Sequence, residues 1–151
     1  IGQGVLGLED ARKGRDTDRA AAYRTPQLAP LEAAELVARF ASASIDVSDG
    51  LLSDARHIAS QSGHCIHIDL ERVPLYEPVE ALDQRLHLVT GGDDYQILMT
   101  VKPGDIQAFQ EAAGRLAHPF SVIGAVRAGE GLTLSYRGQP VPVPARAGFS
   151  H

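Results

Sequence analysis

Two short acidic segments of the sequence contain the residue types that magnesium and phosphate chemistry uses. The first is ASIDVSDGLL at residues 43–52, in which Asp46 and Asp49 lie on either side of Ser48. The second is TGGDDY at residues 90–95. Mg²⁺ prefers one or two carboxylates together with phosphate oxygens and water, and a serine hydroxyl can donate a hydrogen bond to a phosphate oxygen. The two segments are therefore candidates for a shared metal and phosphate site.

The first segment lies where a predicted strand passes into a predicted helix. Residues 43–47 are short and apolar, and Leu51, Ala55 and Ile58 then recur with helical spacing. The first N–H groups of a helix have no partner within the helix, and that end of the helix is positive, which favours a phosphate. Two aspartates at the same place would repel a phosphate unless a cation lies between them.

Structural roles can also explain both segments. Ser and Asp are favoured helix caps, and Gly50 eases the turn, although leucines at 51 and 52 leave no Glu or Gln to complete a capping box. Gly-Gly-Asp-Asp is equally an ordinary turn before a strand. Each segment alone favours the structural explanation, whereas two acidic turns in one small acidic domain fit a polyphosphate and metal site better than either does alone.

The remaining periodicities predict the elements that would position these turns. Helical spacing is expected from Leu31, from Leu51 to Gly63, weakly near residue 80, and at 104–117. Strands are expected at 43–47, 66–70, 96–101, 121–126 and 132–136, the last two as a hairpin, with Val141 and Val143 in an edge strand at most. This order predicts an α/β (α+β) fold, a layered α/β/α sandwich on a mixed sheet.

The first thirty residues differ in character from the rest. They run from a glycine-rich start through an alanine- and arginine-rich polar stretch to prolines at 26 and 30. We expect residues 1–30 to form a leading segment with one or two short helices and a linker, and residues 31–151 to form a single α/β domain. The start at Ile1, without an initiator methionine, suggests a fragment of something longer.

Composition excludes several classes of protein. The net charge of −5 and the scattered basic residues argue against a nucleic-acid partner. No apolar stretch is long enough for a membrane span, and the single Cys65 cannot form an intramolecular disulfide, so we expect a cytoplasmic protein. The sequence has no Walker-type phosphate loop, and its six histidines include no pair at metal-ligand spacing.

Six segments together resemble the C-terminal domain of the thiamine-monophosphate kinase family, and the resemblance covers essentially the whole chain. That family shares a superfamily with aminoimidazole ribonucleotide synthetase, selenophosphate synthetase and a hydrogenase maturation factor. The segments that carry the resemblance are IDVSDGLLSD (45–54), HIASQSG (57–63), IDLERVPL (68–75), TGGDDYQILMTV (90–101), FSVIGAV (120–126) and GFSH (148–151).

The resemblance implies a role for five residues. Asp46 and Asp49 match aspartates that hold Mg²⁺, and Ser48 matches a serine that contacts ATP phosphate. Asp93 matches a residue, usually glutamate, that contacts the thiamine part of the substrate, and Phe149 matches an aromatic residue that lies against the substrate ring. Since Asp93 is one methylene shorter than glutamate, its contact is expected to be looser, water-mediated or compensated elsewhere.

The resemblance also implies an ATP-dependent phosphotransferase. The full-length enzyme would transfer the γ-phosphoryl group of ATP to thiamine monophosphate, giving thiamine diphosphate and ADP. Because the acceptor is already an anionic oxygen, positioning and several Mg²⁺ ions suffice, and no general base is assigned. The family's N-terminal domain, which supplies further metal ligands, most nucleotide contacts and the homodimer interface, has no counterpart in this chain, so the fragment alone is expected to be inactive.

Three other functions remain open. The chain could belong to another ATP-dependent member of the superfamily, with a different substrate for the same chemistry. It could also be a stand-alone ligand-binding or regulatory domain that performs no transfer, or a purely structural domain in which both acidic turns are caps. A substrate panel and magnesium titration would separate these functions.

Overall fold

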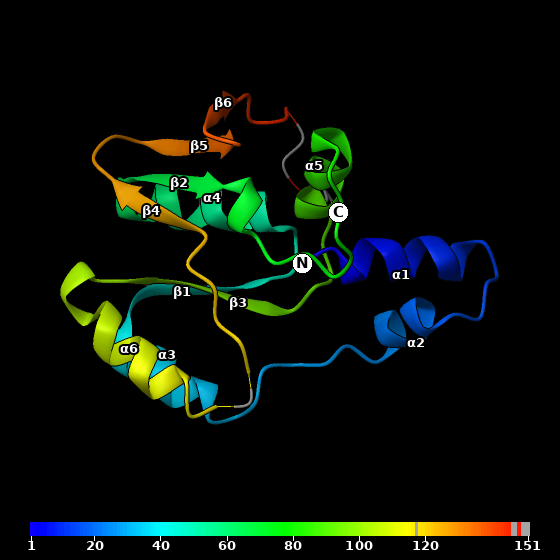
Figure 1. Cartoon of the computed structure of the whole chain (residues 1–151), viewed down its shortest axis with the longest axis horizontal. Coiled ribbons are helices and arrows are strands. Elements are labelled where there is room, and N and C mark those ends of the chain that lie inside the picture. The colour runs from blue at the N-terminus through cyan, green and yellow to red at the C-terminus, as the bar shows by residue number, and fades with distance from the viewer. Residues whose placement is uncertain (117, 146–147, 149–151) are drawn as a thin grey trace.

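The elements of the chain are given by a computed structural model that describes residues 1–116, 118–145 and 148 (Figure 1). The helices in this part of the chain are α1 (Gln3–Arg12), α2 (Asp18–Arg24), α3 (Ala33–Phe40), α4 (Leu51–Ser62), α5 (Leu82–Thr90) and α6 (Ile106–Ala113). The strands are β1 (Ala41–Val47), β2 (Cys65–Asp69), β3 (Gln96–Val101), β4 (Gly124–Arg127), β5 (Gly131–Tyr136) and β6 (Gln139–Val141). Short 3₁₀ turns at Leu70–Arg72 and Pro103–Asp105 follow β2 and β3.

The strands form one mixed sheet and one two-stranded ribbon. In the sheet the order is β4-β2-β5-β6, with β2 antiparallel to β4 and parallel to β5. In the ribbon β1 runs antiparallel to β3, and Asp46 lies opposite Ile97. The predicted α/β fold with a mixed sheet is confirmed, and its strands are divided between these two sheets.

The predicted hairpin between 121–126 and 132–136 is wrong, because β2 lies between β4 and β5. Cys65 at the start of β2 has Arg127 as its partner on one side and Gly131 on the other. Two strand spacings span about 10 Å, and the four Cα steps from 127 to 131 can reach about 13 Å. The three residues between β4 and β5 are therefore enough to cross the end of β2.

The terminal hairpin is instead formed by β5 and β6. Arg137 and Gly138 at its turn have φ of 51° and 73°, the pair of positive values that a type I′ turn requires. The edge strand predicted around Val141 is confirmed as β6, which pairs only with β5 in the described sheet.

Helix α4 supplies the main core. Its apolar face packs against inward-facing residues of β2 and β5, and each fully buried leucine contributes about 2 kcal/mol of burial free energy. The buried members of this core include Leu51, Leu52, Ala55, Ile58, Ile66, Ile68 and Leu134. A second cluster joins α3 and α6 on the side of the ribbon seen below it in Figure 1, where Phe40 and Phe109 meet edge to face at 5.8 Å. The end of β1 and the start of α4 are thus held in the main core, through Val47, Leu51 and Leu52.

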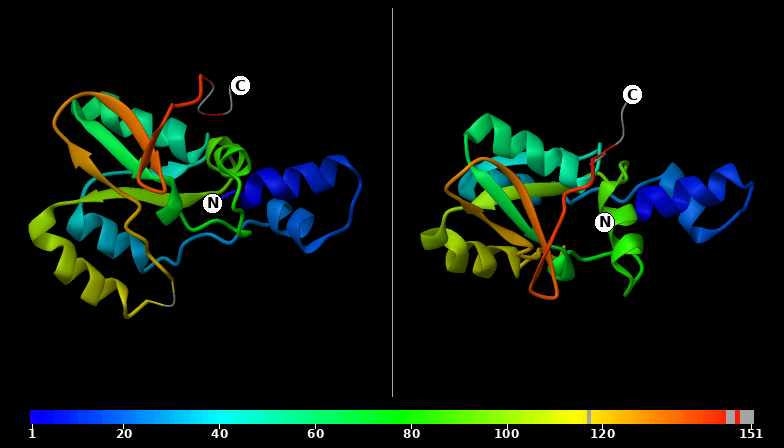
Figure 2. Two further views of the ribbon diagram at one scale, coloured as in Figure 1. Left: turned by 45° about the horizontal axis from the view of Figure 1, so that its top comes forward. Right: turned by 90° about the horizontal axis from the view of Figure 1, so that it is seen from above.

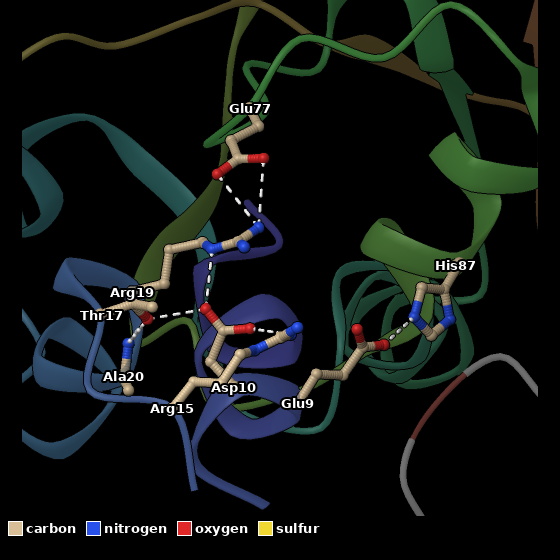
Figure 3. Close-up of polar contacts among 8 residues, drawn as sticks. All are labelled: Glu9, Asp10, Arg15, Thr17, Arg19, Ala20, Glu77 and His87. Carbon is tan, nitrogen blue, oxygen red and sulfur yellow. Dashed lines mark hydrogen bonds and ion pairs between the residues drawn. The ribbon is translucent and has the colours of Figure 1, made fainter. Parts of the chain in front are cut away.

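Helices α1 and α2 form a pair that extends beside α5 and away from the sheets (Figure 2). Asp10, which is buried, accepts hydrogen bonds from Thr17 at 2.6 Å and Arg19 at 3.0 Å and also pairs with Arg15. Figure 3 shows this cluster, in which Arg19 also reaches Glu77 at 3.3 Å. The cluster ties α1 to α2 and to the loop before α5.

A further contact links α1 directly to α5. The Glu9 carboxylate lies 2.9 Å from Nε2 of His87 (Figure 3). None of the helices in the described part of the chain combines the length and the apolar character that a membrane span requires.

Replacing Asp10 with Asn is expected to lower the stability of the protein at neutral pH and to have less effect in acid. The hydrogen bond from Thr17, followed by the contacts with Arg15 and Arg19, lowers the pKa of the Asp10 carboxyl. The ionised group therefore stabilises the folded state above its unfolded pKa of about 3.9, and this contribution is lost as pH falls through the lower folded pKa.

Urea unfolding of both proteins from pH 7 to acid measures this difference. Asp16→Asn is the matched control, because the Asp16 side chain is 99% exposed. A stability difference between wild type and Asp10→Asn that stays constant down to the acid end would contradict the role given to the Asp10 carboxylate.

Candidate functional site

The two acidic turns lie side by side in the structure. The backbone N–H of Asp93 donates to the carbonyl oxygen of Ser48 at 2.9 Å, and the N–H of Tyr95 donates to the carbonyl of Val47 at 2.8 Å. These bonds continue the pairing of β1 and β3 past the end of the ribbon. Residues that are more than forty positions apart in sequence are therefore joined at the point where β1 gives way to α4.

Glycines allow the segments at this junction to approach each other closely. A Cβ atom on Gly92 would lie 2.2 Å from the carbonyl oxygen of Ser48, and one on Gly50 would lie 2.6 Å from that of Thr90. A Cβ on Gly4, in the first turn of α1, would lie 2.2 Å from the carbonyl of Gly92. The start of α1, the turn at 48–50 and the loop at 91–95 therefore interlock through their backbones.

Positive φ values in the second turn fall on residues other than its glycines. Asp93 has φ of 64° and Tyr95 has φ of 50°, a left-handed conformation that costs a side-chain-bearing residue free energy. The backbone bonds from Asp93 to Ser48 and from Tyr95 to Val47 hold this conformation. Gly91 and Gly92 are needed because neighbouring segments lie too close to them for a side chain. The sequence alone does not show this role.

The expectation of free amides at the start of α4 is wrong. Oδ2 of Asp54 accepts hydrogen bonds from the N–H groups of Ser48, Asp49 and Gly50 at 3.1, 3.2 and 3.2 Å. The Asp54 side chain is only 2% exposed. The protein's own carboxylate thus occupies the amides that a phosphate would otherwise use.

The protonation of Asp54 reflects two opposing effects. Burial raises the pKa of its carboxyl, and the three amide bonds act against this rise, while the charge of Asp49 adds to it. The capping-box pattern does not detect Asp54, because Asp54 lies four residues after the N-cap Gly50 and the pattern requires a spacing of three. The signal present in the sequence is an acidic residue in the first turn of a helix whose N-cap is glycine.

Asp94 has a structural role in the second turn. Its carboxylate is 4% exposed and accepts from the N–H of Gly2 at 2.7 Å and of Gly4 at 3.0 Å. It therefore satisfies the first amides of α1, whose N-cap Gly2 has no side chain for this purpose. The helix pair formed by α1 and α2 is anchored to the candidate site through this residue.

Asp93 is held by two tyrosines. The Tyr95 hydroxyl donates to its Oδ1 at 3.0 Å, and the Tyr23 hydroxyl, from α2, lies 3.5 Å from its Oδ2. The hydrogen bond to Asp93 raises the pKa of Tyr95, and the negative charge of Asp46 contributes to the same shift. Asp46, exposed at the end of β1, therefore acts on the same region as Asp93.

The structure divides the predicted site residues into neighbouring groups. Asp49, together with Asp54 and His57, offers ligand atoms that all lie within 4.8 Å of one another. Asp46 is outside this group, although its charge contributes to the raised pKa of Tyr95, which donates to Asp93. The spacing of the histidines gave no indication of His57, which is brought to Asp49 by the first turns of α4.

The last described residue approaches the same helix start. A Cβ atom on Gly148 would lie 2.4 Å from Cβ of Ser53 and 2.9 Å from the carbonyl oxygen of Asp49. The chain thus passes over the beginning of α4 at Gly148. Phe149, the predicted aromatic contact, lies outside the described residues.

Comparisons with known proteins agree on one family. Residues 4–137 match the family model described as AIR synthase related protein, C-terminal domain. A thiamine-monophosphate kinase of Caulobacter vibrioides is 41% identical over an alignment that covers the whole chain and 46% of that protein. The chain therefore spans about half the length of the curated relatives it matches.

Solved structures show the same similarity. The crystal structure of thiamine-monophosphate kinase from Stenotrophomonas maltophilia K279a superposes with a TM-score of 0.72 at 28% identity, covering 93% of this chain and 48% of that one. The structure of AaThiL complexed with AMPPCP and TMP superposes with a TM-score of 0.66 at 28% identity, covering 93% of this chain and 46% of that one.

Proposed function

Because the chain belongs to the AIR synthase related protein family, as a C-terminal domain, we propose that it is the C-terminal half of a thiamine-monophosphate kinase. The full-length protein would transfer the γ-phosphoryl group of ATP to thiamine monophosphate, giving thiamine diphosphate and ADP. The observation that carries this proposal is the direct backbone bond between the two acidic turns, from Asp93 to Ser48 at 2.9 Å. This bond connects Ser48, which we propose to contact the nucleotide, with Asp93, which we propose to contact the substrate.

We assign the metal ligands to the first turn. Asp46 and Asp49 would hold Mg²⁺, since carboxylate oxygens are the donors that this ion prefers. Asp54 already fills the amides of the turn, so a phosphate meets carboxylates there rather than free N–H groups. Bound Mg²⁺ would neutralise the charge of the two phosphate chains, and the Ser48 hydroxyl would donate to an ATP phosphate oxygen.

We assign the substrate contacts to the second turn. Asp93 would contact the thiamine part of the acceptor, with Tyr95 and Tyr23 fixing the carboxylate through their hydroxyls. These two bonds would restrict where the Asp93 oxygens lie, which is how we expect the shorter side chain to be compensated. Phe149 stays our prediction for the ring that lies against the substrate.

The remaining partners follow from the same proposal. The domain that the chain does not include would supply the other metal ligands, most of the nucleotide contacts and the interface of a homodimer. A cytoplasmic protein with ATP, Mg²⁺ and thiamine monophosphate as its ligands, and with no nucleic-acid partner, fits the acidic composition.

An assay of thiamine diphosphate formation tests the proposed function. The full-length protein is expected to form thiamine diphosphate only when ATP, Mg²⁺ and thiamine monophosphate are all present, whereas the 151-residue chain is expected to form none because half of its site is missing. Thiamine in place of its monophosphate is the control acceptor.

Two results of this assay would contradict the proposal. Turnover of another superfamily substrate without thiamine diphosphate formation would assign the chain to a different branch. Tight binding of thiamine monophosphate by the full-length protein with no transfer under any condition would favour a ligand-binding protein.

A further inference from the structure

We propose that Asp54 is a positioning residue for phosphoryl transfer, which holds the turn at 48–50 so that Asp49 and Ser48 can act on metal and phosphate. This inference rests on the proposed kinase function. Asp54 contacts the backbone of both residues and is assigned no contact with substrate of its own.

The geometry gives one carboxylate oxygen control over three consecutive residues. Oδ2 of Asp54 accepts from the amides of Ser48, Asp49 and Gly50 at 3.1, 3.2 and 3.2 Å. Hydrogen bonds to an ionised acceptor are about twice as strong as neutral ones. Three such bonds to one buried atom restrict the peptide planes on both sides of Asp49, and therefore the direction in which its side chain leaves the backbone.

Gly50 contributes no side chain that could hold the turn. Gly50, the N-cap of α4, has φ of 119° and ψ of 142° and makes no side-chain cap bond. On the opposite side, the carbonyl of Ser48 accepts from Asp93 at 2.9 Å. Asp54 and the second acidic turn therefore hold the first turn from its two sides, one through its N–H groups and the other through a carbonyl.

Asp54 also affects the charge of the site. Its carboxylate lies within 4.8 Å of a carboxylate oxygen of Asp49 and a ring nitrogen of His57. A buried negative charge at this distance opposes the positive end of α4 and favours a cation over a bare phosphate beside Asp49. A residue that only capped the helix would stabilise α4 without changing the demand for Mg²⁺.

The test compares Asp54→Asn and Asp54→Ala with Asp10→Asn in the full-length protein. Asp10 is a buried carboxylate on α1 that accepts hydrogen bonds from Thr17, the N-cap of α2, and from Arg19 on α2. None of these residues belongs to the turn at 48–50, so the loss of Asp10 controls for a general loss of stability. The Mg²⁺ concentration at half-maximal rate and kcat are measured for each protein below its unfolding temperature.

For Asp54→Asn we expect the Mg²⁺ concentration at half-maximal rate to rise by about 10-fold or more, or kcat to fall by the same factor. Effects of this size are typical of residues that orient metal ligands. Asp54→Ala should have the larger effect, because an amide oxygen can still accept from the turn and a methyl group cannot. Asp10→Asn should change either quantity by less than about 2-fold. Equal kinetics in folded Asp54 and Asp10 variants would overturn the proposal.

If the Asp54 variants do not fold, amide hydrogen exchange of the wild-type protein tests the positioning role instead. The amides of Ser48, Asp49 and Gly50 are expected to be protected to a similar degree, because one acceptor holds all three. Fast exchange at these amides would overturn the positioning role. A wild-type protein with protected amides but no thiamine diphosphate formation would instead contradict the proposed kinase function and leave the geometry of the turn confirmed.

Discussion

Replacement of Asp49 by Asn in the full-length protein is expected to lower kcat for thiamine diphosphate formation by about 100-fold to 1,000-fold, since a metal ligand contributes several kcal/mol of charge stabilisation in the transition state. Asn keeps the shape of the side chain but loses the charge that attracts Mg²⁺. Asp49 is half-buried at the start of α4, and its backbone N–H, which Asp54 holds, is unchanged by the substitution. Folding stability should therefore change little.

Asp46→Asn is expected to act in the same direction, because Asp46 is exposed at the end of β1 and its charge reaches Tyr95 in the second turn. Asp83→Asn is the matched control, with the same chemical change in the first turn of α5. Rates are measured at saturating ATP over a range of Mg²⁺. Near-normal turnover of both Asp46→Asn and Asp49→Asn at saturating Mg²⁺ would remove the metal role from this turn.

Replacement of Gly92 by Ala is expected to destabilise the fold by about 3 kcal/mol, the upper part of the range for overpacked sites. The added Cβ would lie 2.2 Å from the carbonyl oxygen of Ser48. That atom belongs to the backbone of the first turn, so no change of rotamer relieves the contact. The two turns would have to separate, at the cost of the bond between Asp93 and Ser48.

Urea unfolding with Gly104→Ala as the control measures this effect. Gly104 lies in the 3₁₀ turn after β3, and a Cβ there would meet nothing within 4 Å, so its substitution should change stability by less than about 0.5 kcal/mol. Similar unfolding midpoints for Gly92→Ala and Gly104→Ala would show that the turns are not in close contact.

Local patterns predicted the elements of the fold well where one face is buried. The alternation at 66–70 corresponds to β2, in which Ile66 and Ile68 are buried, and the repeat of Leu51, Ala55 and Ile58 marks the buried face of α4. These predictions succeed because burial imposes a period of two or of 3.6 on the sequence. Strand partners impose no such period, which is why the insertion of β2 between β4 and β5 was missed.

The candidate site was predicted in part for the same reason. Residue type and turn position indicated the two acidic segments, and the structure places them together. Contacts across the fold decide which carboxylates accept hydrogen bonds from backbone amides. Asp94 accepts from amides at the start of α1, and Asp54 accepts from the turn before its own helix. Sequence spacing carries no record of the first of these contacts, because its partners lie about ninety residues away.

The most direct test of the proposed site is a crystal structure of the full-length protein with Mn²⁺, a non-hydrolysable ATP analogue and thiamine monophosphate, in which anomalous scattering locates the ions. We expect ions within about 2.2 Å of carboxylate oxygens of Asp46 and Asp49, a distance typical of Mg²⁺ and similar ions, with the Ser48 hydroxyl at a phosphate oxygen and the acceptor beside Asp93. Ions bound elsewhere, with both aspartates in contact only with protein atoms, would contradict the assignment of this junction as the metal and phosphate site.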